Sequence, residues 1–394
     1  MDTRASCDFL QEFMSIIDAS ALRLAIFSDT YPPQVNGVAR TLERLVDAVS
    51  ERGGAARVFT VTDPESAAQD HVLRYPSVPF WAYNQVRMAW PRQRSVERSL
   101  HEFAPTLVHA ATEFGVGLAG RTTARSLRVP FVSSYHTSFS AYAKFYRLGL
   151  LAGPGWSFMR WFHNAGLRTY CPTRAIVDEV KAQGFTNTAV WSRGVDGSRF
   201  SPRFRSSALR ARISASDDTL VVVYVGRLAA EKGLDVALRA LRLVNDARPG
   251  RIRFVAVGDG PYEAEVRAQA PAESWLPGKL LGDDLSAAYA SGDVFLFPST
   301  TDTFGNVLLE AMASGMPVVG ADVGPTREQL APDRGWLVAP GDAAAFAESL
   351  IALVDDRARL RVAREQALAF AASKTWAQVW DTLICDYLTL HRLR

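Results

Sequence analysis

The sequence predicts an α/β protein built from two domains, each with a parallel β-sheet flanked by helices. Short apolar runs rich in β-branched residues alternate with helical stretches along the chain, and this alternation is typical of parallel strands joined by helical crossovers. A chain of 394 residues with 48% hydrophobic content exceeds the ~250–300 residues at which a single core stops growing. The sequence therefore predicts two hydrophobic cores.

The domain boundary is predicted at a cluster of proline and serine within residues 200–207, because such clusters mark linkers. Strand-like runs precede it at 24–27, 57–61, 106–109, 131–134, 169–171 and 189–191, and follow it at 221–225, 254–257, 294–297 and 318–320. We predict a first domain at 1–203, with an extension at 1–20, and a second domain at 204–372. In the final segment, 373–394, aromatic residues recur at near-helical spacing and predict a C-terminal helix.

The segment 299–319 carries the strongest functional pattern. An apolar run precedes it, and glycine and proline end its apolar stretch 307–312, which predicts a strand, a loop and then a helix. Asp302 in the loop and Glu310 eight residues later can face one ligand, because eight residues make a little over two helical turns. The free amides of residues 304–307 at the positive end of this helix favour phosphate. The alternative is a capping residue before an ordinary amphipathic helix, with Glu310 solvated.

A second loop supplies two cations. The β-branched run 221–225 leads into a glycine turn followed by Arg227 and Lys232, a spacing suited to gripping a diphosphate from one loop. The loop is not a P-loop, because the Walker pattern needs glycine before the lysine and Ser or Thr after it, whereas Glu231 and Gly233 occupy these places. ATP is therefore not the first expectation.

A third loop, after the run 254–257, contains Gly258, Asp259 and Gly260. It departs from the dinucleotide-binding fingerprint, since Glu263 stands where the third glycine belongs. A dehydrogenase that uses NAD is therefore disfavoured. Asp259 also fits the first position of an Asx turn.

These motifs resemble the retaining glycosyltransferases of family four, which have the GT-B fold of two Rossmann-like domains facing across a cleft. The resemblance covers the chain from Leu22 to about Tyr387. Asp302 replaces the first glutamate of the family's signature, in which seven residues separate two glutamates. By resemblance the C-terminal helix crosses back onto the first domain, whereas its pattern alone also fits packing on the second. The motifs that carry the resemblance, with the loops above, are Asp29-Thr-Tyr31-Pro-Pro33-Gln-Val-Asn36-Gly37-Val38, Tyr135-His136-Thr137, Ser192-Arg-Gly194-Val-Asp196, Gly226-Arg227-Leu with Glu231-Lys232, and Val257-Gly258-Asp259-Gly260-Pro261.

The resemblance implies a role for each candidate site residue. Arg227 and Lys232 bind the diphosphate of a sugar nucleotide in place of a metal ion. Glu310 binds the ribose hydroxyls, and Asp302 binds the donor sugar. His136 reaches the donor sugar or orients the acceptor, although a lone histidine also fits a structural role. The further donor-binding residues implied are Gly37 from the opposite domain, which also fits a plain turn, Phe304, Gly305 and Asn306 through their backbone, and Gly258 and Asp259 near the base.

The resemblance also implies a reaction, the retaining transfer of a hexose, mannose from GDP-mannose, onto a glycolipid or glycan acceptor. A glycolipid synthase that transfers glucose or sulfoquinovose from a UDP-sugar is the first alternative. An epimerase or hydrolase of nucleotide sugars with the same fold is the second, and a non-catalytic sensor of sugar nucleotides is the third. No residue stands out as a covalent nucleophile, and Glu113 is a candidate to assist from the first domain.

Composition argues against several other classes of protein. The net charge of +3 is small for a nucleic-acid-binding protein, for which a dense basic face is expected. No apolar run approaches the ~18 residues of a membrane span. Residues 1–20 lack the basic region of an export signal. We therefore expect a cytoplasmic protein.

The chain also lacks the usual metal-binding patterns. The three cysteines, Cys7, Cys171 and Cys385, are far apart and lack Cys-x-x-Cys spacing, which argues against both disulfides and zinc. The histidines include no His-x-x-x-His pair. Asp283 and Asp284 are adjacent rather than forming the Asp-x-Asp pair that commonly holds Mg²⁺. We therefore expect neither a metal nor another cofactor, with the sugar nucleotide as substrate.

The stretch 80–98 combines arginines with large aromatic residues. Such a stretch favours an anionic membrane surface, with rings at the headgroup level and cations on phosphates. The alternative is a solvated face over buried aromatic side chains. If the first reading holds, the protein binds peripherally to the inner face of the cell membrane. The residues concerned are Phe80, Trp81, Tyr83, Arg87, Trp90, Arg92, Arg94 and Arg98.

Overall fold

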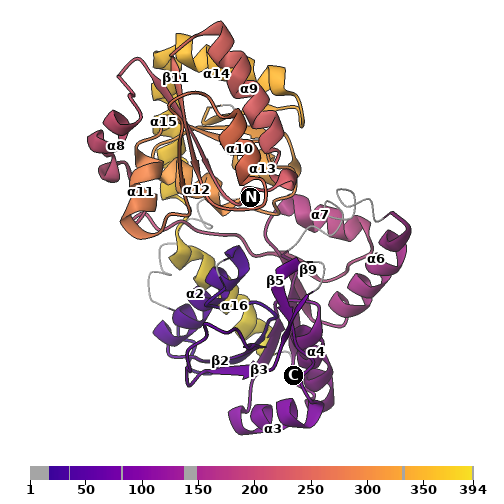
Figure 1. Cartoon of the computed structure of the whole chain (residues 1–394). Helices are drawn as coiled ribbons and strands as arrows, with labels where there is room; N and C mark the ends of the chain where they lie inside the picture. The colour runs from indigo at the N-terminus through magenta and orange to yellow at the C-terminus, as the bar shows by residue number, and fades with distance from the viewer. Residues whose placement is uncertain (1–16, 35, 81–82, 137–148, 331–332, 393–394) are drawn as a thin grey trace, which may run out of the picture.

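The computed structural model of the chain describes residues 17–34, 36–80, 83–136, 149–330 and 333–392. Figure 1 shows two lobes, with the N-terminal domain below in indigo and purple and the C-terminal domain above in orange and yellow. The predicted α/β class with two parallel sheets is confirmed. The predicted extension at 1–20 lies almost wholly outside the described residues.

A seven-stranded sheet forms the N-terminal domain, in the order β3-β2-β1-β6-β7-β8-β9. All of its neighbouring strands are parallel, and β4 and β5 form a separate antiparallel pair. The elements are β1 (Arg23–Phe27), α2 (Gly37–Glu51), β2 (Ala55–Val61), β3 (Val72–Tyr75), β4 (Val78–Phe80), β5 (Tyr83–Met88), α3 (Gln93–Phe103), β6 (Leu107–Ala110), α4 (Gly115–Leu127), β7 (Phe131–Ser134), α6 (Gly149–His163), β8 (Arg168–Cys171), α7 (Arg174–Ala182) and β9 (Thr188–Val190).

The C-terminal domain has a six-stranded sheet in the order β12-β11-β10-β13-β14-β15. Its neighbouring strands are also parallel. The elements are η1 (Pro202–Phe204), α8 (Ser207–Arg212), β10 (Leu220–Val225), η2 (Ala230–Lys232), α9 (Leu234–Ala247), β11 (Ile252–Val257), α10 (Glu263–Gln269), β12 (Trp275–Gly278), α11 (Gly282–Ala290), β13 (Val294–Phe297), α12 (Asn306–Ala313), β14 (Val318–Ala321), α13 (Gly324–Gln329), β15 (Gly335–Val338), α14 (Ala343–Asp355), α15 (Arg357–Ala372) and α16 (Trp376–His391).

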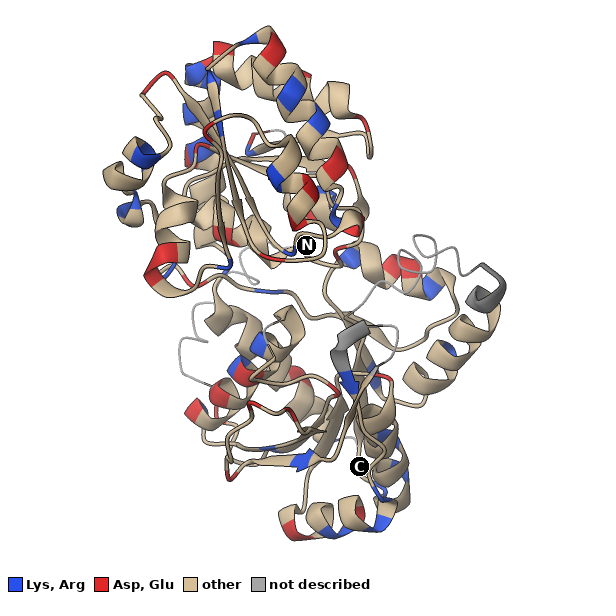
Figure 2. Ribbon diagram, viewed as in Figure 1, with Lys and Arg blue, Asp and Glu red and all other residues tan. Residues whose placement is uncertain are grey.

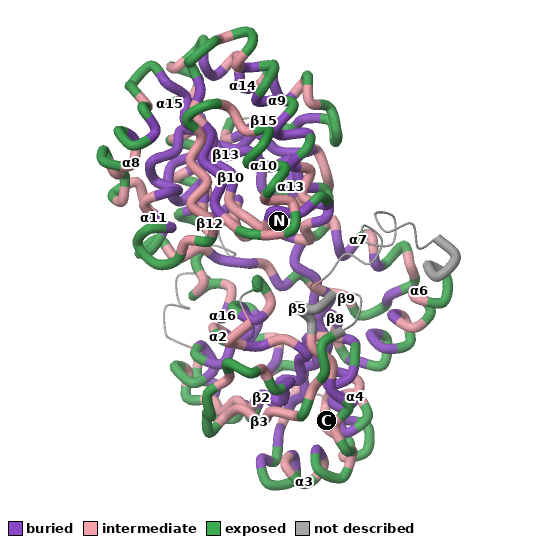
Figure 3. Tube along the Cα trace, viewed as in Figure 1, coloured by how far each residue is buried: buried purple, intermediate pink, exposed green. Residues whose placement is uncertain are grey.

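Helices bury both faces of each sheet, which explains why the strands are continuous apolar runs. In β10, Val222 faces a core formed with α9 and α14, and Val223 faces a core formed with α11, α12 and α15, because successive side chains of a strand point to opposite faces. The N-terminal sheet is covered in the same way, by α2 and α16 on one face and by α3 and α4 on the other. Figure 3 shows the buried strands at the centre of both lobes.

The C-terminal helix α16 packs on the N-terminal domain. Trp380, Ile384 and Tyr387 are buried in the same core as α2 and β1. The Tyr387 hydroxyl lies 2.7 Å from Nδ1 of His109, and Asp381 accepts a hydrogen bond of 2.7 Å from Arg52. The yellow helix therefore lies in the lower lobe of Figure 1 although α15 before it belongs to the upper lobe.

Every strand that the sequence predicts is present, with ends shifted by at most two residues. The sequence did not predict β3, β4, β5, β12 or β15. These strands are short, and several lack a continuous apolar run because they lie at a sheet edge or outside the two large sheets. None of the helices in the described part of the chain is long and apolar enough to cross a membrane.

Candidate active site

The loop between β13 and α12 ends in a helix terminus that is open to an anion. Gly305 precedes the first helical residue, Asn306, with a φ of 78°, which a residue without Cβ adopts at little cost. No side chain caps this helix start, so its first amides remain available as donors. Together with the positive end of the helix dipole, these amides favour a phosphate group.

Asp302, in the same loop, is paired with Lys232 from η2. The Lys232 ammonium donates to both carboxylate oxygens, at 2.8 and 2.9 Å, and Ser299 donates a third hydrogen bond of 2.5 Å. Burial disfavours the charged form of Asp302, but Lys232 and these hydrogen bonds outweigh it and hold the pKa below its ordinary value. The structure thus brings together the predicted sugar-binding carboxylate and one of the predicted phosphate-binding cations.

Arg227 lies in the turn after β10, where its guanidinium pairs with Glu231. The Tyr224 hydroxyl donates to the Arg227 carbonyl at 2.9 Å. Burial lowers the pKa of Arg227, and the nearby charge of Asp302 opposes this shift. The charges of Arg227 and Lys232 both act on Asp302. The structure therefore brings the two predicted cations together around this carboxylate.

Gly258 and Gly260 allow the turns after β10 and β11 to pack directly against each other. A Cβ on Gly258 would lie 1.9 Å from the Gly226 carbonyl oxygen, and the Leu228 amide donates to the Asp259 carbonyl at 2.7 Å. The Asp259 side chain is exposed. The role of Gly258 in the structure is therefore close backbone packing beneath the site, whereas Asp259 remains accessible to a ligand.

Glu310 lies on α12 and accepts a hydrogen bond of 2.8 Å from the Tyr289 hydroxyl. Burial raises the pKa of its carboxyl, and the Tyr289 hydrogen bond and the charges of Arg40, Arg44 and Arg199 oppose this shift. Arg40 and Arg44 come from α2 of the N-terminal domain. Cations of the N-terminal domain therefore act on the carboxylate that is predicted to hold the ribose.

Gly37 starts α2 and lies close to the Asn306 side chain of α12. A Cβ on Gly37 would lie 3.4 Å from the side-chain nitrogen of Asn306, so the start of α2 lies next to the start of α12. The side-chain oxygen of Asn306 is buried without a hydrogen-bond partner among the described residues. The two domains thus meet at the start of α12, where a phosphate is expected.

His136 follows β7 and contacts the loop that carries Asp302. Its carbonyl accepts a hydrogen bond of 2.8 Å from the Thr303 hydroxyl, and Arg193 donates to its Nδ1 at 3.1 Å. Burial, followed by the charge of Arg193, holds the pKa of His136 well below its ordinary value. The imidazole is therefore neutral with its proton on Nε2, and this atom is buried with no partner in the part of the chain that the structure describes.

The remaining residues considered from the sequence do not contribute a side chain to this group. Phe304 contributes its side chain to the core, so only its backbone is left to contact a donor. Glu113 is buried, with Oε1 lying 3.3 Å from Nε2 of His163, and this pairing does not support a role in assisting transfer. Asp283 and Asp284 are exposed in the first turn of α11. Among the described residues, no three His, Cys, Asp or Glu side chains gather as a metal site.

The described arginines of the stretch 80–98 differ in their surroundings. Arg87 donates to the Thr62 and Ser77 carbonyls, both at 3.0 Å, and thereby holds β5 in place. Arg92, Arg94 and Arg98 are exposed around α3, at the end of the N-terminal domain away from the C-terminal domain (Figure 1). Trp81 and the Tyr83 side chain lie outside the described residues, and Trp90 is 67% exposed. Figure 2 shows basic and acidic residues interspersed over both domains.

Sequence reasoning gave no role to several residues that shape the site. Tyr289 holds Glu310, Arg193 sets the tautomer of His136, and Arg40 and Arg44 face Glu310 from the other domain. The only available signal was the spacing of Arg40 and Arg44, which lie four residues apart directly after Gly37 and so share a helix face.

Two Rossmann-like domains that present paired cations and carboxylates across a cleft are the architecture of GT-B glycosyltransferases. Family models support this class, since "Glycosyltransferase Family 4" matches residues 35–199 and "Glycosyl transferases group 1" matches residues 219–356. The chain belongs to glycosyltransferase family 4 and is a glycosyltransferase, as the resemblance implied.

Curated relatives cover most of the chain. A GDP-mannose-dependent alpha-mannosyltransferase from Mycobacterium tuberculosis is 34% identical over 93% of this chain and 96% of its own length. The sulfoquinovosyl transferase SQD2 from Arabidopsis thaliana is 33% identical over 85% of this chain and 67% of its own length. Among solved structures, a sucrose-phosphate synthase from Thermosynechococcus elongatus superposes with a TM-score of 0.78 at 18% identity, covering 94% of this chain and 99% of that one, which establishes the fold alone.

Proposed function

We propose that this protein transfers mannose from GDP-mannose, with retention of the anomeric configuration and without a metal ion, to a glycolipid or glycan acceptor at a membrane surface. The observation that carries the proposal is the meeting of Lys232, Asp302 and the open start of α12 in one cleft with Glu310. The choice of mannose rests on the mannosyltransferase relatives, of which a second, from Mycolicibacterium smegmatis, is 32% identical over 93% of this chain.

The site residues supply what such a transfer needs. As the bond from the sugar to the β-phosphate breaks, negative charge grows on the phosphate, and fixed cations and amides stabilise that charge without reorganising. Arg227, Lys232 and the α12 amides are suited to this task, so the leaving group can be stabilised without a metal ion. The departing phosphate can also accept the proton of the acceptor hydroxyl on the same face of the sugar, which would retain the configuration.

His136 and Asp302 are suited to the donor sugar. The neutral imidazole presents an N–H donor at Nε2, and the carboxylate accepts hydrogen bonds from hydroxyl groups. Asp302 is one methylene shorter than glutamate and is already held by Lys232. Its contact with the sugar is therefore longer than that of a glutamate, or it passes through a water molecule. This difference is the main reason to test the donor directly.

A UDP-sugar-dependent glycolipid synthase is the second candidate. The similarity to SQD2 and to an alpha-monoglucosyldiacylglycerol synthase from Streptococcus pneumoniae, 28% identical over 76% of this chain, favours it. A lipid-linked acceptor fits both candidates, so the nucleotide and the sugar distinguish them.

The deciding experiment combines a donor screen with product analysis. The purified protein is heated with GDP-mannose, UDP-glucose or UDP-sulfoquinovose, and a ligand at a hundred times its dissociation constant adds about 2.7 kcal/mol of stability. The stabilising donor is then incubated with lipid acceptors, with and without EDTA, and the anomer of the product is assigned by NMR. We expect GDP-mannose to stabilise most, an α-linked product and no effect of EDTA.

Each part of the proposal has its own contrary outcome. Stabilisation by a UDP-sugar alone selects the second candidate. Loss of activity in EDTA that Mg²⁺ restores refutes the metal-independent step, and a β-linked product refutes retention. Release of free sugar or of an epimer without any acceptor indicates a hydrolase or an epimerase.

A further inference from the structure

Thr303 connects the two residues that are proposed to contact the donor sugar. It follows Asp302 in the loop between β13 and α12, and its hydroxyl donates a hydrogen bond of 2.8 Å to the carbonyl of His136. Asp302 belongs to the C-terminal domain, whereas His136 follows β7 of the N-terminal domain. The hydrogen bond from Thr303 therefore joins the two domains at the proposed sugar site.

The backbone of Thr303 makes a second contact with the N-terminal domain. Its carbonyl accepts a hydrogen bond of 3.3 Å from the hydroxyl of Thr173. Thr173 also caps α7, since its hydroxyl oxygen accepts from the Ile176 amide at 3.3 Å. A hydroxyl can donate one hydrogen bond while it accepts another, so the cap and the contact between domains coexist. Residues of the N-terminal domain thus hold Thr303 by its side chain and by its backbone.

Helix α13 reinforces this contact from the C-terminal domain. The Glu328 carboxylate accepts from the backbone amides of Arg174, at 3.0 Å, and of Ala175. These two residues begin α7, and their amides lack partners within the helix. The neighbouring Gln329 side chain donates to the carbonyl of Phe304, in the site loop. One helix therefore holds the start of α7 next to the loop that carries Asp302.

Each of the two proposed sugar-binding residues is fixed within its own domain. Arg193 donates to His136 at 3.1 Å, and Lys232 donates to Asp302 at 2.8 Å. The position of one relative to the other therefore depends on contacts that cross between the domains. Thr303 makes such contacts directly beside Asp302.

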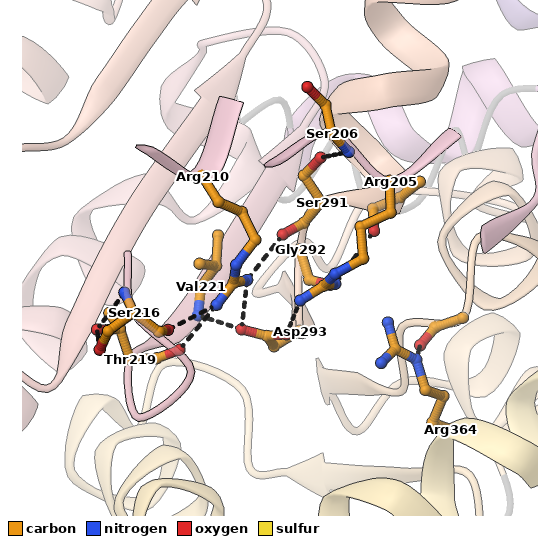
Figure 4. Close-up of polar contacts among 12 residues, drawn as sticks. Arg205, Ser206, Arg210, Ser216, Thr219, Val221, Ser291, Gly292, Asp293 and Arg364 are labelled. Atoms are coloured by element: carbon orange, nitrogen blue, oxygen red, sulfur yellow. Dashed lines mark hydrogen bonds and ion pairs between the residues drawn. The ribbon is translucent and has the colours of Figure 1, made fainter. Parts of the chain in front are cut away.

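The interdomain linker is fastened at the other end of β13. Figure 4 shows Arg210 directed at Asp293, to which it donates at 3.0 Å, and the Ser206 amide donates to the Ser291 hydroxyl at 3.0 Å. Asp293 directly precedes β13, whereas the site loop follows the carboxyl end of this strand. These bonds lie within the C-terminal domain and act away from the site loop.

We propose that Thr303 is a positioning residue for the transfer reaction, whose hydroxyl holds His136 at the distance from Asp302 that the donor sugar requires. The inference rests on the proposed function, in which these two residues contact the sugar. Thr303 acts through the backbone carbonyl of His136 and thereby places the imidazole. A misplacement of about 1 Å can lower a rate a hundredfold, so a hydrogen bond of modest strength can control turnover.

The test compares Thr303→Val, which keeps the shape of the side chain but lacks the hydroxyl, with Thr303→Ser, which keeps the hydroxyl. We expect kcat of Thr303→Val to fall by about tenfold to a hundredfold, and Thr303→Ser to recover most of this loss. The nucleoside diphosphate of the selected donor should bind to Thr303→Val with parental affinity in calorimetry. The reason is that Glu310, Arg227 and Lys232, which are proposed to bind ribose and phosphate, all belong to the C-terminal domain.

A double-variant cycle separates positioning from a general structural role. His136→Ala removes the imidazole but keeps the carbonyl that Thr303 contacts. If Thr303 acts by placing the imidazole, Thr303→Val should add little to the loss of kcat in His136→Ala. Thr122→Val is the matched control with parental turnover, because the Thr122 hydroxyl bonds within its own helix, to the Leu118 carbonyl at 2.9 Å.

Hydrogen exchange gives a readout that does not depend on activity. Amides of β7 and of the start of α7 should exchange faster in Thr303→Val than in the parent, because a contact that holds both segments is weakened. In Thr303→Ser and Thr122→Val their exchange should match the parent. Unchanged exchange in Thr303→Val contradicts the proposal.

The kinetic outcomes that overturn the proposal are equally specific. They are parental kcat in Thr303→Val, a loss in Thr303→Ser as large as in Thr303→Val, additive losses in the cycle with His136→Ala, weaker nucleotide binding in Thr303→Val, and an equal loss in Thr122→Val. A parent that transfers no sugar refutes the proposed function itself. A His136→Ala protein with parental turnover refutes the role of His136, and the role of Thr303 with it. Additive losses in an active enzyme refute the role of Thr303 alone.

Discussion

Arg193 donates a hydrogen bond of 3.1 Å to Nδ1 of His136, and a guanidinium group can only donate. The neutral imidazole must therefore carry its proton on Nε2, the atom that has no partner among the described residues. Arg193 is itself buried and donates to the Trp191 carbonyl at 2.7 Å. A cation beneath the histidine thus keeps the imidazole both neutral and oriented.

The first prediction concerns this pair. Arg193→Gln removes the cation that disfavours protonation of His136, so the pKa of His136 should rise. Activity, which needs the neutral imidazole, should then fall on the acid side at a higher pH than in the parent. At neutral pH we expect turnover to fall by about tenfold, the lower range for a lost charged hydrogen bond.

The measurement is the pH profile of kcat for the parent, Arg193→Gln and Arg193→Lys. The lysine variant keeps a cation and should restore the acid limb of the profile in part. A profile of unchanged shape with lower activity throughout would mean that Arg193 only supports the fold.

The second prediction concerns Arg227 and Lys232. Each Ala variant removes a contact that strengthens as the diphosphate departs, so kcat should fall by about a hundredfold or more, as for loss of one oxyanion donor. The control is Arg239→Gln, which removes an exposed cation of α9 outside the site. Steady-state kinetics of the folded variants decide the outcome, and near-normal turnover in either Ala variant contradicts the phosphate assignment.

The third prediction concerns Glu310. A ribose contact is present in both the ground state and the transition state, so Glu310→Gln should raise KM and the dissociation constant of the nucleotide by about tenfold, with little change in kcat. Calorimetry with GDP and UDP measures the effect, and Tyr289→Phe, which removes the hydroxyl that orients Glu310, should have a smaller effect in the same direction. Unchanged affinity in Glu310→Gln would place this carboxylate elsewhere in the reaction.

The fourth prediction concerns the stability of the N-terminal domain. Asp29 follows β1 and accepts hydrogen bonds of 2.6 Å from Thr112 and 3.0 Å from the Val116 amide, yet burial raises its pKa from 3.8 to about 6. Below pH 3.8 the carboxyl is protonated in both the folded and the unfolded chain. As the pH rises, the unfolded chain releases this proton first, and stability is lost until the folded pKa is passed. The loss should be about 2–3 kcal/mol in total.

Urea unfolding of the parent and of Asp29→Asn between pH 4.5 and 7.5 tests this sign. The asparagine does not titrate, so the parent should lose free energy of unfolding relative to the variant as the pH rises across this range. A difference between the two proteins that stays constant with pH, or that changes in the other direction, would show that Asp29 is ionised in the folded protein throughout.

The fifth prediction concerns membrane binding. Because Arg87 is engaged with Thr62 and Ser77, the relevant variant changes only the exposed arginines Arg92, Arg94 and Arg98 to Gln. Each arginine near an anionic surface contributes about 1 kcal/mol, so vesicle affinity should fall by about two decades. Co-sedimentation with anionic liposomes at low and high salt measures it. If the parent stays in the supernatant, or if parent and variant pellet equally at every salt, the arginines form an ordinary solvated face.

Local pattern was enough to predict the two parallel sheets, the main strands, the loops that carry Arg227, Lys232 and Asp302, and the helix that carries Glu310. Strands buried on both faces must be apolar throughout, and a glycine turn before a helix has a recognisable composition. These properties are encoded within short windows of sequence. Resemblance to a family then correctly predicted the class of enzyme.

Tertiary structure alone decided the contacts between segments that are distant along the chain. The pairing of Lys232 with Asp302 and the orientation of His136 by Arg193 join loops that are distant along the chain within one domain. The approach of Arg44 to Glu310 depends on how the two domains close on each other. Electrostatic environment depends on distance and burial in the folded molecule, and neither follows from the local order of residues.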